Sequence, residues 1–148
     1  MAAILHRIAI NNVGIETVYR AISTIEGLAA WWTVDTSGTA NRLGGALQFR
    51  FPGGGFDMQV VDLRKNELLE WEVVGGEKEW IGTKIRWALT SSENFTVLLF
   101  KHDDWKEPTE FMHHCSTKWA IFLMSLKSYL ETGTGAPSPH DVKIDDWN

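Results

Sequence analysis

The sequence predicts an α+β protein in which a strongly curved, six-stranded antiparallel sheet wraps around one long C-terminal helix. Apolar and polar residues alternate with a period of two over roughly sixty residues in the middle of the chain. Short turn-rich segments separate the alternating stretches. A long amphipathic stripe at helical spacing follows them. Each element has one apolar face to bury, and wrapping the sheet around the helix buries all of these faces together.

The first third of the chain predicts one strand and two short helices. Residues 4–10 alternate as a strand and end at the turn-like "NNVG". Residues 15–24 carry apolar side chains at helical spacing. The stretch "EGLAAWW" then places Leu28, Trp31 and Trp32 on one face of a second short helix. That face must bury two of the largest side chains.

The middle of the chain predicts five further strands joined by hairpins. The turn-rich connectors are "PGGG", "RKNE" and "SSEN". The inward-facing residues of the first four of these strands are Leu47, Phe49 and Phe51; Phe56, Met58 and Val60; Leu69, Trp71 and Val73; and Ile85, Trp87 and Leu89. The strand "FTVLLFKH" is apolar on both faces. We expect its Leu98, Phe100 and His102 to face inward, and Val97 and Leu99 to form an apolar strip outside.

A long helix is expected from about Thr109 to about Glu131. Gly133 follows at the position where a glycine commonly ends a helix. The tail from about 132 is rich in Pro, Gly and Asp and predicts irregular structure within a single domain, 1–148. The apolar stripe of the helix comprises Met112, Cys115, Trp119, Phe122, Leu123, Leu126 and Leu130.

Composition and charge exclude several classes of protein. The 148 residues, 44% of them hydrophobic, suit one domain with a sizeable core. Cys115 is the only cysteine, which excludes an internal disulfide and an all-cysteine metal site and fits a reducing cytoplasm. We expect a cytoplasmic protein, since no apolar run reaches membrane-spanning length. The net charge of -5 argues against nucleic acid and anionic membranes as partners.

Several stretches together resemble the START-like (SRPBCC) superfamily and, within it, proteins like the activator of heat-shock protein 90 ATPase. These stretches are "EGLAAWW", the "HDDW" that ends at Trp105, and "FLMSLKSYLETGTGAP" from Phe122 to Pro137. The resemblance extends over nearly the whole chain. It implies a helix-grip fold, in which the sheet grips the last helix and often leaves a cavity. It implies little about activity, because this fold hosts lipid binders, cyclases and proteins of other roles.

The chain departs from the family pattern at two turns. Family members often carry an Ala-Pro pair after the first strand, where this chain has "NNVG", and a glycine where it has Asp104. The resemblance to a chaperone activator also implies a chaperone contact. The eukaryotic activator has an additional N-terminal domain that this sequence does not contain, so the ATPase-stimulating role transfers poorly.

Most residues with reactive side chains have a simpler structural explanation. Gly53 to Gly55 lie between two alternating strands, which predicts a hairpin rather than a phosphate loop. His113 and His114 are adjacent on the expected helix and point about 100° apart, which disfavours one metal site. Cys115 is typical of a small core residue. We therefore expect no metal, no cofactor and no catalytic residue, unless an inward-facing His102 moves protons in a cyclase- or hydrolase-type enzyme.

The eight tryptophans predict the function more directly than any ionisable group. Large rings pack imperfectly and offer an N–H to a bound molecule, although the same rings can fill a core. We expect a protein that binds an apolar or aromatic small molecule, with a chaperone-associated partner-binding protein and an enzyme as alternatives. The outer strip also predicts a homodimer. The expected lining of the cavity is Trp31, Trp32, Phe49, Met58, Trp71, Trp87, Phe100, His102, Trp119 and Phe122.

Overall fold

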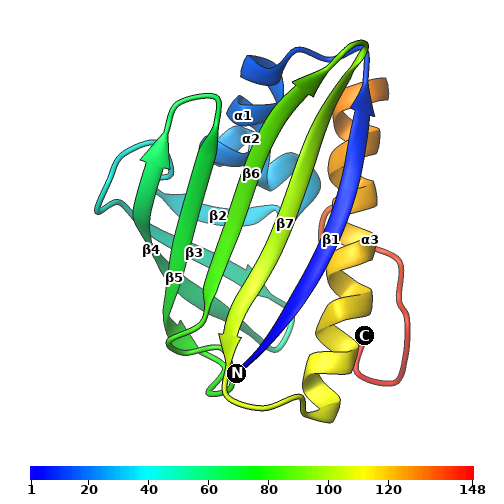
Figure 1. Cartoon of the computed structure of the whole chain (residues 1–148). Coiled ribbons are helices and arrows are strands. Elements are labelled where there is room, and N and C mark those ends of the chain that lie inside the picture. Colours follow the sequence, from blue (N-terminus) through cyan, green and yellow to red (C-terminus); the bar gives the residue numbers. More distant parts are fainter.

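Seven antiparallel strands form one bent sheet in the computed structural model, which describes residues 1–148 (Figure 1). The strand order is β1-β7-β6-β5-β4-β3-β2. Two short helices follow the first strand and a long helix follows the last, which confirms the predicted helix-grip fold. The elements are β1 (Ala2–Asn11), α1 (Ile15–Ser23), α2 (Ile25–Trp31), β2 (Asp35–Gly38), β3 (Ala46–Phe51), β4 (Gly54–Arg64), β5 (Leu68–Gly76), β6 (Lys84–Ser92), β7 (Phe95–Trp105) and α3 (Glu110–Thr132).

The predicted count of six strands is wrong by one, because β2 was not expected. This strand has the sequence DTSG and no apolar alternation. It is a strand only because it pairs with β3, where Asp35 lies opposite Arg50 and Gly38 opposite Leu47. Its residues are mostly exposed, since it forms one edge of the sheet.

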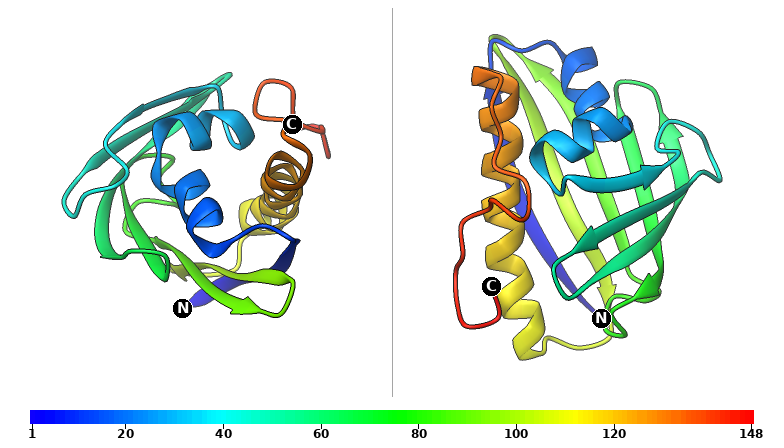
Figure 2. Two further views of the ribbon diagram at one scale, coloured as in Figure 1. Left: turned by 90° about the horizontal axis from the view of Figure 1, so that it is seen from above. Right: turned by 180° about the vertical axis from the view of Figure 1, so that it is seen from behind.

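The sheet curls around α1 and α2 at one end, while α3 runs beside β1 (Figure 2). Side chains of α3 satisfy polar groups along the free edge of β1. Lys127 Nζ donates to the Ala9 carbonyl, and the Asn11 amide donates to Glu131 over 2.8 Å. Helix α3 therefore stands where an eighth strand would otherwise pair.

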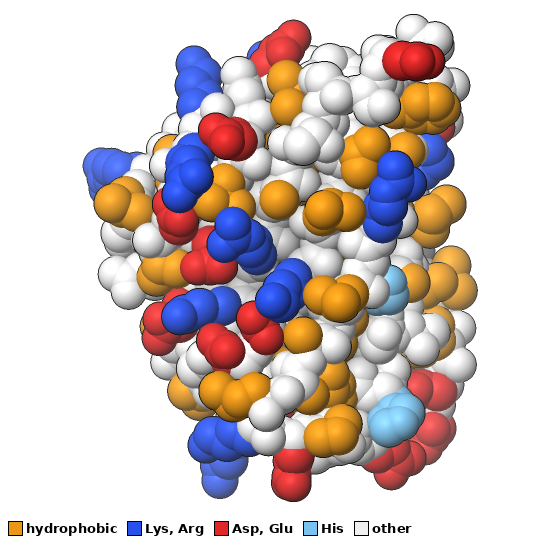
Figure 3. All heavy atoms as spheres, viewed as in Figure 1, with side chains coloured by type: hydrophobic (Ala, Val, Ile, Leu, Met, Phe, Trp, Pro, Cys, Tyr) orange, Lys and Arg blue, Asp and Glu red, His pale blue; other side chains and the backbone are white.

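The predicted inward faces of the sheet are buried, except that Phe51 and Phe56 are only partly buried. Leu98, Phe100 and His102 are at most 2% exposed, which confirms the inward face of the ambiguous strand β7. On the outer face Leu99 is 51% exposed, whereas Val97 is only 8% exposed, so the expected apolar strip is interrupted. Figure 3 shows acidic and basic side chains interspersed with scattered apolar ones on the face viewed.

The ends of α3 lie close to those predicted. The Thr109 side chain accepts a hydrogen bond from the Met112 amide and caps the N-terminus. Gly133 ends the helix in the left-handed conformation, with φ at 89°. None of the helices has the length and apolar character that crossing a membrane requires.

The tail after Gly133 turns back and runs along α3 (Figure 2). It contains no helix or strand, but Ser138 forms a bridge with Thr33. The Ser138 amide donates to the Trp32 carbonyl over 2.8 Å, and the Val34 amide donates to the Ser138 carbonyl over 3.1 Å. The tail is thereby fastened to the segment that follows α2.

Candidate functional site

A cavity of about 700 Å³ opens between the sheet and the first half of α3. Four segments surround it: the β3–β4 hairpin, the β5–β6 connection, the face of α3 from Phe111 to Phe122, and the end of the tail at Trp147 and Asn148. Its volume lies within the range typical of small-molecule sites. It lies at the end of the fold away from α1, and Trp32, which follows the last residue of α2, borders it.

Glycines form much of the rim. Gly53, Gly54 and Gly55 of the hairpin and Gly76 of β5 all border the cavity. Pro52 and Gly53 make the two-residue turn, in which Gly53 has a φ of 94°, and Gly54 pairs with Phe51. The run is therefore the predicted hairpin, and its lack of side chains leaves space open.

Aromatic rings make the walls. Phe56 stacks on Trp80 with ring centroids 3.8 Å apart, and Trp80 lies nearly parallel to Trp119 at 5.8 Å. Phe51 reaches Phe122 across the gap between hairpin and helix, at 6.3 Å. The faces of such rings can bind apolar or aromatic molecules without requiring hydrogen bonds of fixed direction.

Three of the ten residues expected to line a cavity do border it: Trp32, Trp119 and Phe122. The other seven lie in the packed interior outside the cavity. Trp32 packs against Phe49 at 4.3 Å and against Trp119 at 5.0 Å, so rings fill the space near α2. The seven interior residues are Trp31, Phe49, Met58, Trp71, Trp87, Phe100 and His102.

The lining also includes residues that sequence reasoning did not select. Phe51 and Phe56 flank the glycine run, and the alternation that predicts both to face inward is the signal that could have placed them in the lining. Trp80 lies in a connection without periodicity, and Trp147 lies in the irregular tail. Neither has a sequence pattern that indicates what it faces.

His102 is held in one tautomer inside the core. Trp119 Nε1 donates to Nδ1 of His102 over 3.0 Å, so the proton of a neutral ring resides on Nε2. Nε2 lies 2.8 Å from the Thr83 hydroxyl, which donates onward to the Trp80 carbonyl over 2.6 Å. Burial lowers the pKa of His102 to about 3, against a small opposing effect of Asp103. The ring is therefore neutral at pH 7 and hydrogen-bonded through both nitrogens, and it lies behind Trp119 without bordering the cavity itself.

Cys115 contributes no reactive group, and the paired histidines do not converge on one site, although His114 borders the cavity. Cys115 is 4% exposed, and burial raises the pKa of its thiol to about 12, so the thiolate nucleophile is absent at neutral pH. His113 Nδ1 lies 2.9 Å from the Thr109 carbonyl, whereas His114 Nδ1 lies 2.7 Å from Asp145. The two rings therefore serve separate local contacts.

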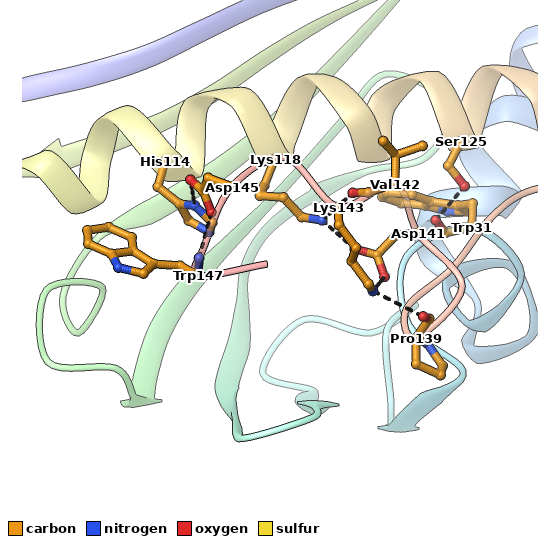
Figure 4. A network of polar contacts seen from close by, with 10 residues as sticks. All are labelled: Trp31, His114, Lys118, Ser125, Pro139, Asp141, Val142, Lys143, Asp145 and Trp147. Carbon is orange, nitrogen blue, oxygen red and sulfur yellow. Dashed lines mark hydrogen bonds and ion pairs between the residues drawn. The ribbon is translucent and has the colours of Figure 1, made fainter.

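A partly buried ionic cluster joins the cavity wall to the tail (Figure 4). Lys118 Nζ donates to Asp141 and, over 2.9 Å, to the Val142 carbonyl. Lys143 donates to the other carboxylate oxygen of Asp141 over 3.0 Å. Burial opposes ionisation of Asp141, but the hydrogen bonds from the two lysines outweigh it and hold its pKa below the ordinary value.

A second contact places the tail end at the cavity (Figure 4). The Trp147 amide donates to Asp145 over 2.9 Å, and its ring lies 5.4 Å from the ring of His114. The hydrogen bond from His114 lowers the pKa of Asp145. Trp147 is 49% exposed, so it covers part of the cavity while one side of the ring remains accessible.

Comparison with known proteins identifies one family and a widespread fold. Residues 12–131 match the protein family described as "Activator of Hsp90 ATPase homolog 1-like protein". The solution structure of the Aha1 dimer from Colwellia psychrerythraea is 46% identical in sequence, with a TM-score of 0.84. The match covers 91% of this chain and 100% of that one. No curated protein matches the sequence.

More distant solved structures share the fold. Protein SSP2350 from Staphylococcus saprophyticus is 20% identical, with a TM-score of 0.75 over 90% of this chain and 95% of that one. Protein BH1534 from Bacillus halodurans is 22% identical, with a TM-score of 0.72 over 88% of this chain and 98% of that one. At such identities the likeness concerns architecture alone.

Proposed function

The chain belongs to the family of Activator of Hsp90 ATPase homolog 1-like proteins, and we propose that it binds an apolar or aromatic small molecule between the sheet and α3. The observation that carries this proposal is the cavity of about 700 Å³ with walls of aromatic rings. Trp32, Trp119 and Phe122 would touch the ligand directly. The seven interior residues predicted with them would form the rigid wall behind these three.

The chemistry of the lining favours binding over catalysis. A protonated Cys115 offers no nucleophile, and the neutral His102 lies outside the cavity. General acid–base catalysis needs a group within hydrogen-bonding reach of the reacting atom. A binding protein is therefore the better supported proposal, and a cyclase or hydrolase that uses His102 is the weaker one.

Gly54 offers a direct test of the site. It lies opposite Phe51 in the hairpin, so a side chain there would share the face of Phe51, and a Cβ atom at this position meets nothing within 4 Å. We expect Gly54→Leu to fill the mouth of the cavity. N-phenylnaphthylamine, a neutral aromatic probe, should show enhanced fluorescence with the wild type and at least about ten-fold weaker binding to Gly54→Leu.

Gly54→Ala is the matched control, because it makes the same backbone change with far less volume. Its affinity for N-phenylnaphthylamine should stay within about two-fold of the wild type. Thermal unfolding of both variants would establish that the fold is kept. Probe binding that is equal in the wild type and in Gly54→Leu would place the binding elsewhere and overturn the proposed site.

A contact with a chaperone is the second proposed function. The family description and the 46% identity to a protein named Aha1 favour it. The test is a pull-down of the purified chain with a bacterial chaperone of the heat-shock protein 90 class, followed by an ATPase assay. Absence of both binding and stimulation would remove this proposal. A cytoplasmic location, where such a chaperone resides, belongs to the same proposal.

We also propose that the chain forms a homodimer. The related Colwellia psychrerythraea structure is described as a dimer, and Leu5 and Leu99 are more than half exposed on neighbouring strands. Light scattering at micromolar concentration should give twice the monomer mass. Leu99→Lys should shift the protein to monomer if this face forms the interface. A monomeric wild type at that concentration would contradict the proposal.

A further inference from the structure

We propose that the ligand of this cavity carries an anionic oxygen group beside its apolar body, and that Lys118 is the residue that recognises this group. The inference rests on the proposed ligand-binding function and adds the chemical class of the ligand. It follows from the position of one buried ammonium group beside the aromatic rings of the cavity wall. Carboxylates are the simplest members of this class.

Lys118 projects from the face of α3 that borders the cavity. It lies three residues after Cys115 and four before Phe122, and all three border the cavity. The whole residue is only 8% exposed, and Nζ lies 5.0 Å from the centre of the Phe122 ring. A positive charge buried to this degree requires compensation by negative charge.

The negative charge that the protein itself places around the Lys118 ammonium group is only partial compensation. Asp141 is the only carboxylate bound to Lys118, and Lys143 binds the second oxygen of the same carboxylate. Two ammonium groups therefore bind one carboxylate, that of the buried Lys118 and that of Lys143, whose side chain is 54% exposed and partly solvated. Asp145, the next acid along the tail, is hydrogen-bonded to His114. Glu77 is the one acidic side chain in the lining, and it lies exposed at the β5–β6 connection.

The hydrogen bonds of Lys118 leave room for one more acceptor. An ammonium group has three N–H donors. Two of them reach Asp141 and the Val142 carbonyl, and no other oxygen accepts from Nζ. The remaining contact is with the face of Phe122, an interaction that an anionic oxygen in the cavity would exceed in strength.

Lys118 has a competing role as an anchor for the tail, and the two roles predict opposite effects of changing Asp141. If Lys118 serves only as an anchor, Asp141→Asn and Lys118→Met both loosen the tail and disturb the cavity in the same way. If Lys118 recognises an anion, Asp141→Asn removes its competitor and leaves the positive charge in place. Binding of an anionic probe is then kept or strengthened in Asp141→Asn and weakened in Lys118→Met.

The experiment compares two fluorescent probes that share an aromatic skeleton. Anilinonaphthalene sulfonate carries one anionic group, and N-phenylnaphthylamine carries none. We expect Lys118→Met to lose about ten-fold or more in affinity for the sulfonate, since a hydrogen bond to a charged group is involved. Affinity for the neutral probe should change by less than about two-fold. Asp141→Asn should bind the sulfonate at least as tightly as the wild type does.

Lys78→Met is the matched control, because Lys78 also borders the cavity but is exposed. Its effect on either probe should stay below about two-fold, as expected for a solvated charge. Circular dichroism checks that each variant is folded. Should Lys118→Met not fold, Asp141→Asn alone decides, because weaker sulfonate binding in that variant contradicts the inference.

The outcomes separate this inference from the proposed function. If the neutral probe binds and Lys118→Met leaves sulfonate binding unchanged, the cavity binds ligands but does not select anions. Parallel weakening of both probes in Lys118→Met and Asp141→Asn identifies Lys118 as an anchor only. If neither probe binds the wild type, the proposed function fails together with the inference.

Discussion

The space between the sheet and α3 differs at its two ends. Near α2 it is filled by rings that do not border the cavity: Trp31 contacts Trp87, and Trp71 contacts Phe49 and Trp87. At the other end a cavity of about 700 Å³ remains, although rings line it as well. The number of aromatic residues is therefore not what distinguishes a core from a site.

The difference arises from where side chains are missing. At the filled end, rings from α2 and from the sheet meet across the interior. At the open end, the sheet contributes the glycines of the β3–β4 hairpin and Gly76. The tail closes part of this gap with Trp147, which stays half-exposed. A void in this fold thus reflects missing side-chain volume rather than a special set of lining residues.

The largest expected effect is at the filled end. Trp87 is fully buried and contacts Trp31, Phe100 and Trp119, and its Nε1 has no hydrogen-bond partner, so the side chain contributes packing alone. Trp87→Ala should lower the free energy of unfolding by about 3–5 kcal/mol. Urea denaturation followed by far-UV circular dichroism measures this loss.

Phe56→Ala is the control at the open end. Phe56 stacks on Trp80 but borders space that is already empty, so its removal should cost less than half as much as Trp87→Ala. Equal losses of stability at the two positions would mean that the cavity wall is packed like the core. The distinction between the two ends would then be wrong.

Much of the fold was predictable because the apolar face of each element is local in sequence. Leu69, Trp71 and Val73 alternate, and all three are buried. Strand β2 escaped prediction because DTSG becomes a strand only by pairing with β3. Its identity depends on a partner that follows it in the chain.

The site was less predictable than the fold. Periodicity indicates which side chains face inward, and Trp32, Trp71 and Trp119 do so. It does not indicate whether inward-facing rings from distant segments meet or leave a gap. Trp80 and Trp147 lie outside every periodic stretch, and only the folded chain brings them to the same cavity.

The second prediction concerns pH and the hydrogen bonds of His102, which lies between the two ends. An ordinary histidine has a pKa of about 6.5, and in the folded protein this ring has a pKa of about 3. Between these values the unfolded chain binds a proton that the folded protein does not. Stability should therefore fall as the pH drops below about 6.5, by up to about 1.4 kcal/mol per pH unit.

His102→Gln should remove this pH dependence. The variant should be less stable than the wild type at pH 7, because Trp119 loses its acceptor, and the two proteins should converge toward about pH 5. The other histidines are common to both proteins and cancel in the difference. The lowered pKa values of Asp103 and Asp141 affect stability only at more acidic pH. Parallel stability curves from pH 7 to 5 would contradict the assignment of a neutral, buried ring.

The smallest expected effect concerns how the tail is held at each end. Ser125 Oγ donates to the Trp31 carbonyl over 2.7 Å and accepts from the Ala136 amide over 2.8 Å, in the buried part of the molecule. Ser125→Ala leaves both backbone groups without this partner and should lower the free energy of unfolding by about 1–2 kcal/mol. At the cavity the tail is held by Asp145 and His114, which are more accessible to water. Asp145→Asn should therefore change thermal stability less than Ser125→Ala, while increasing access of N-phenylnaphthylamine to the cavity.

A larger loss of stability in Asp145→Asn than in Ser125→Ala would contradict this order. The end of the tail would then be a structural part of the fold rather than a cover over the cavity.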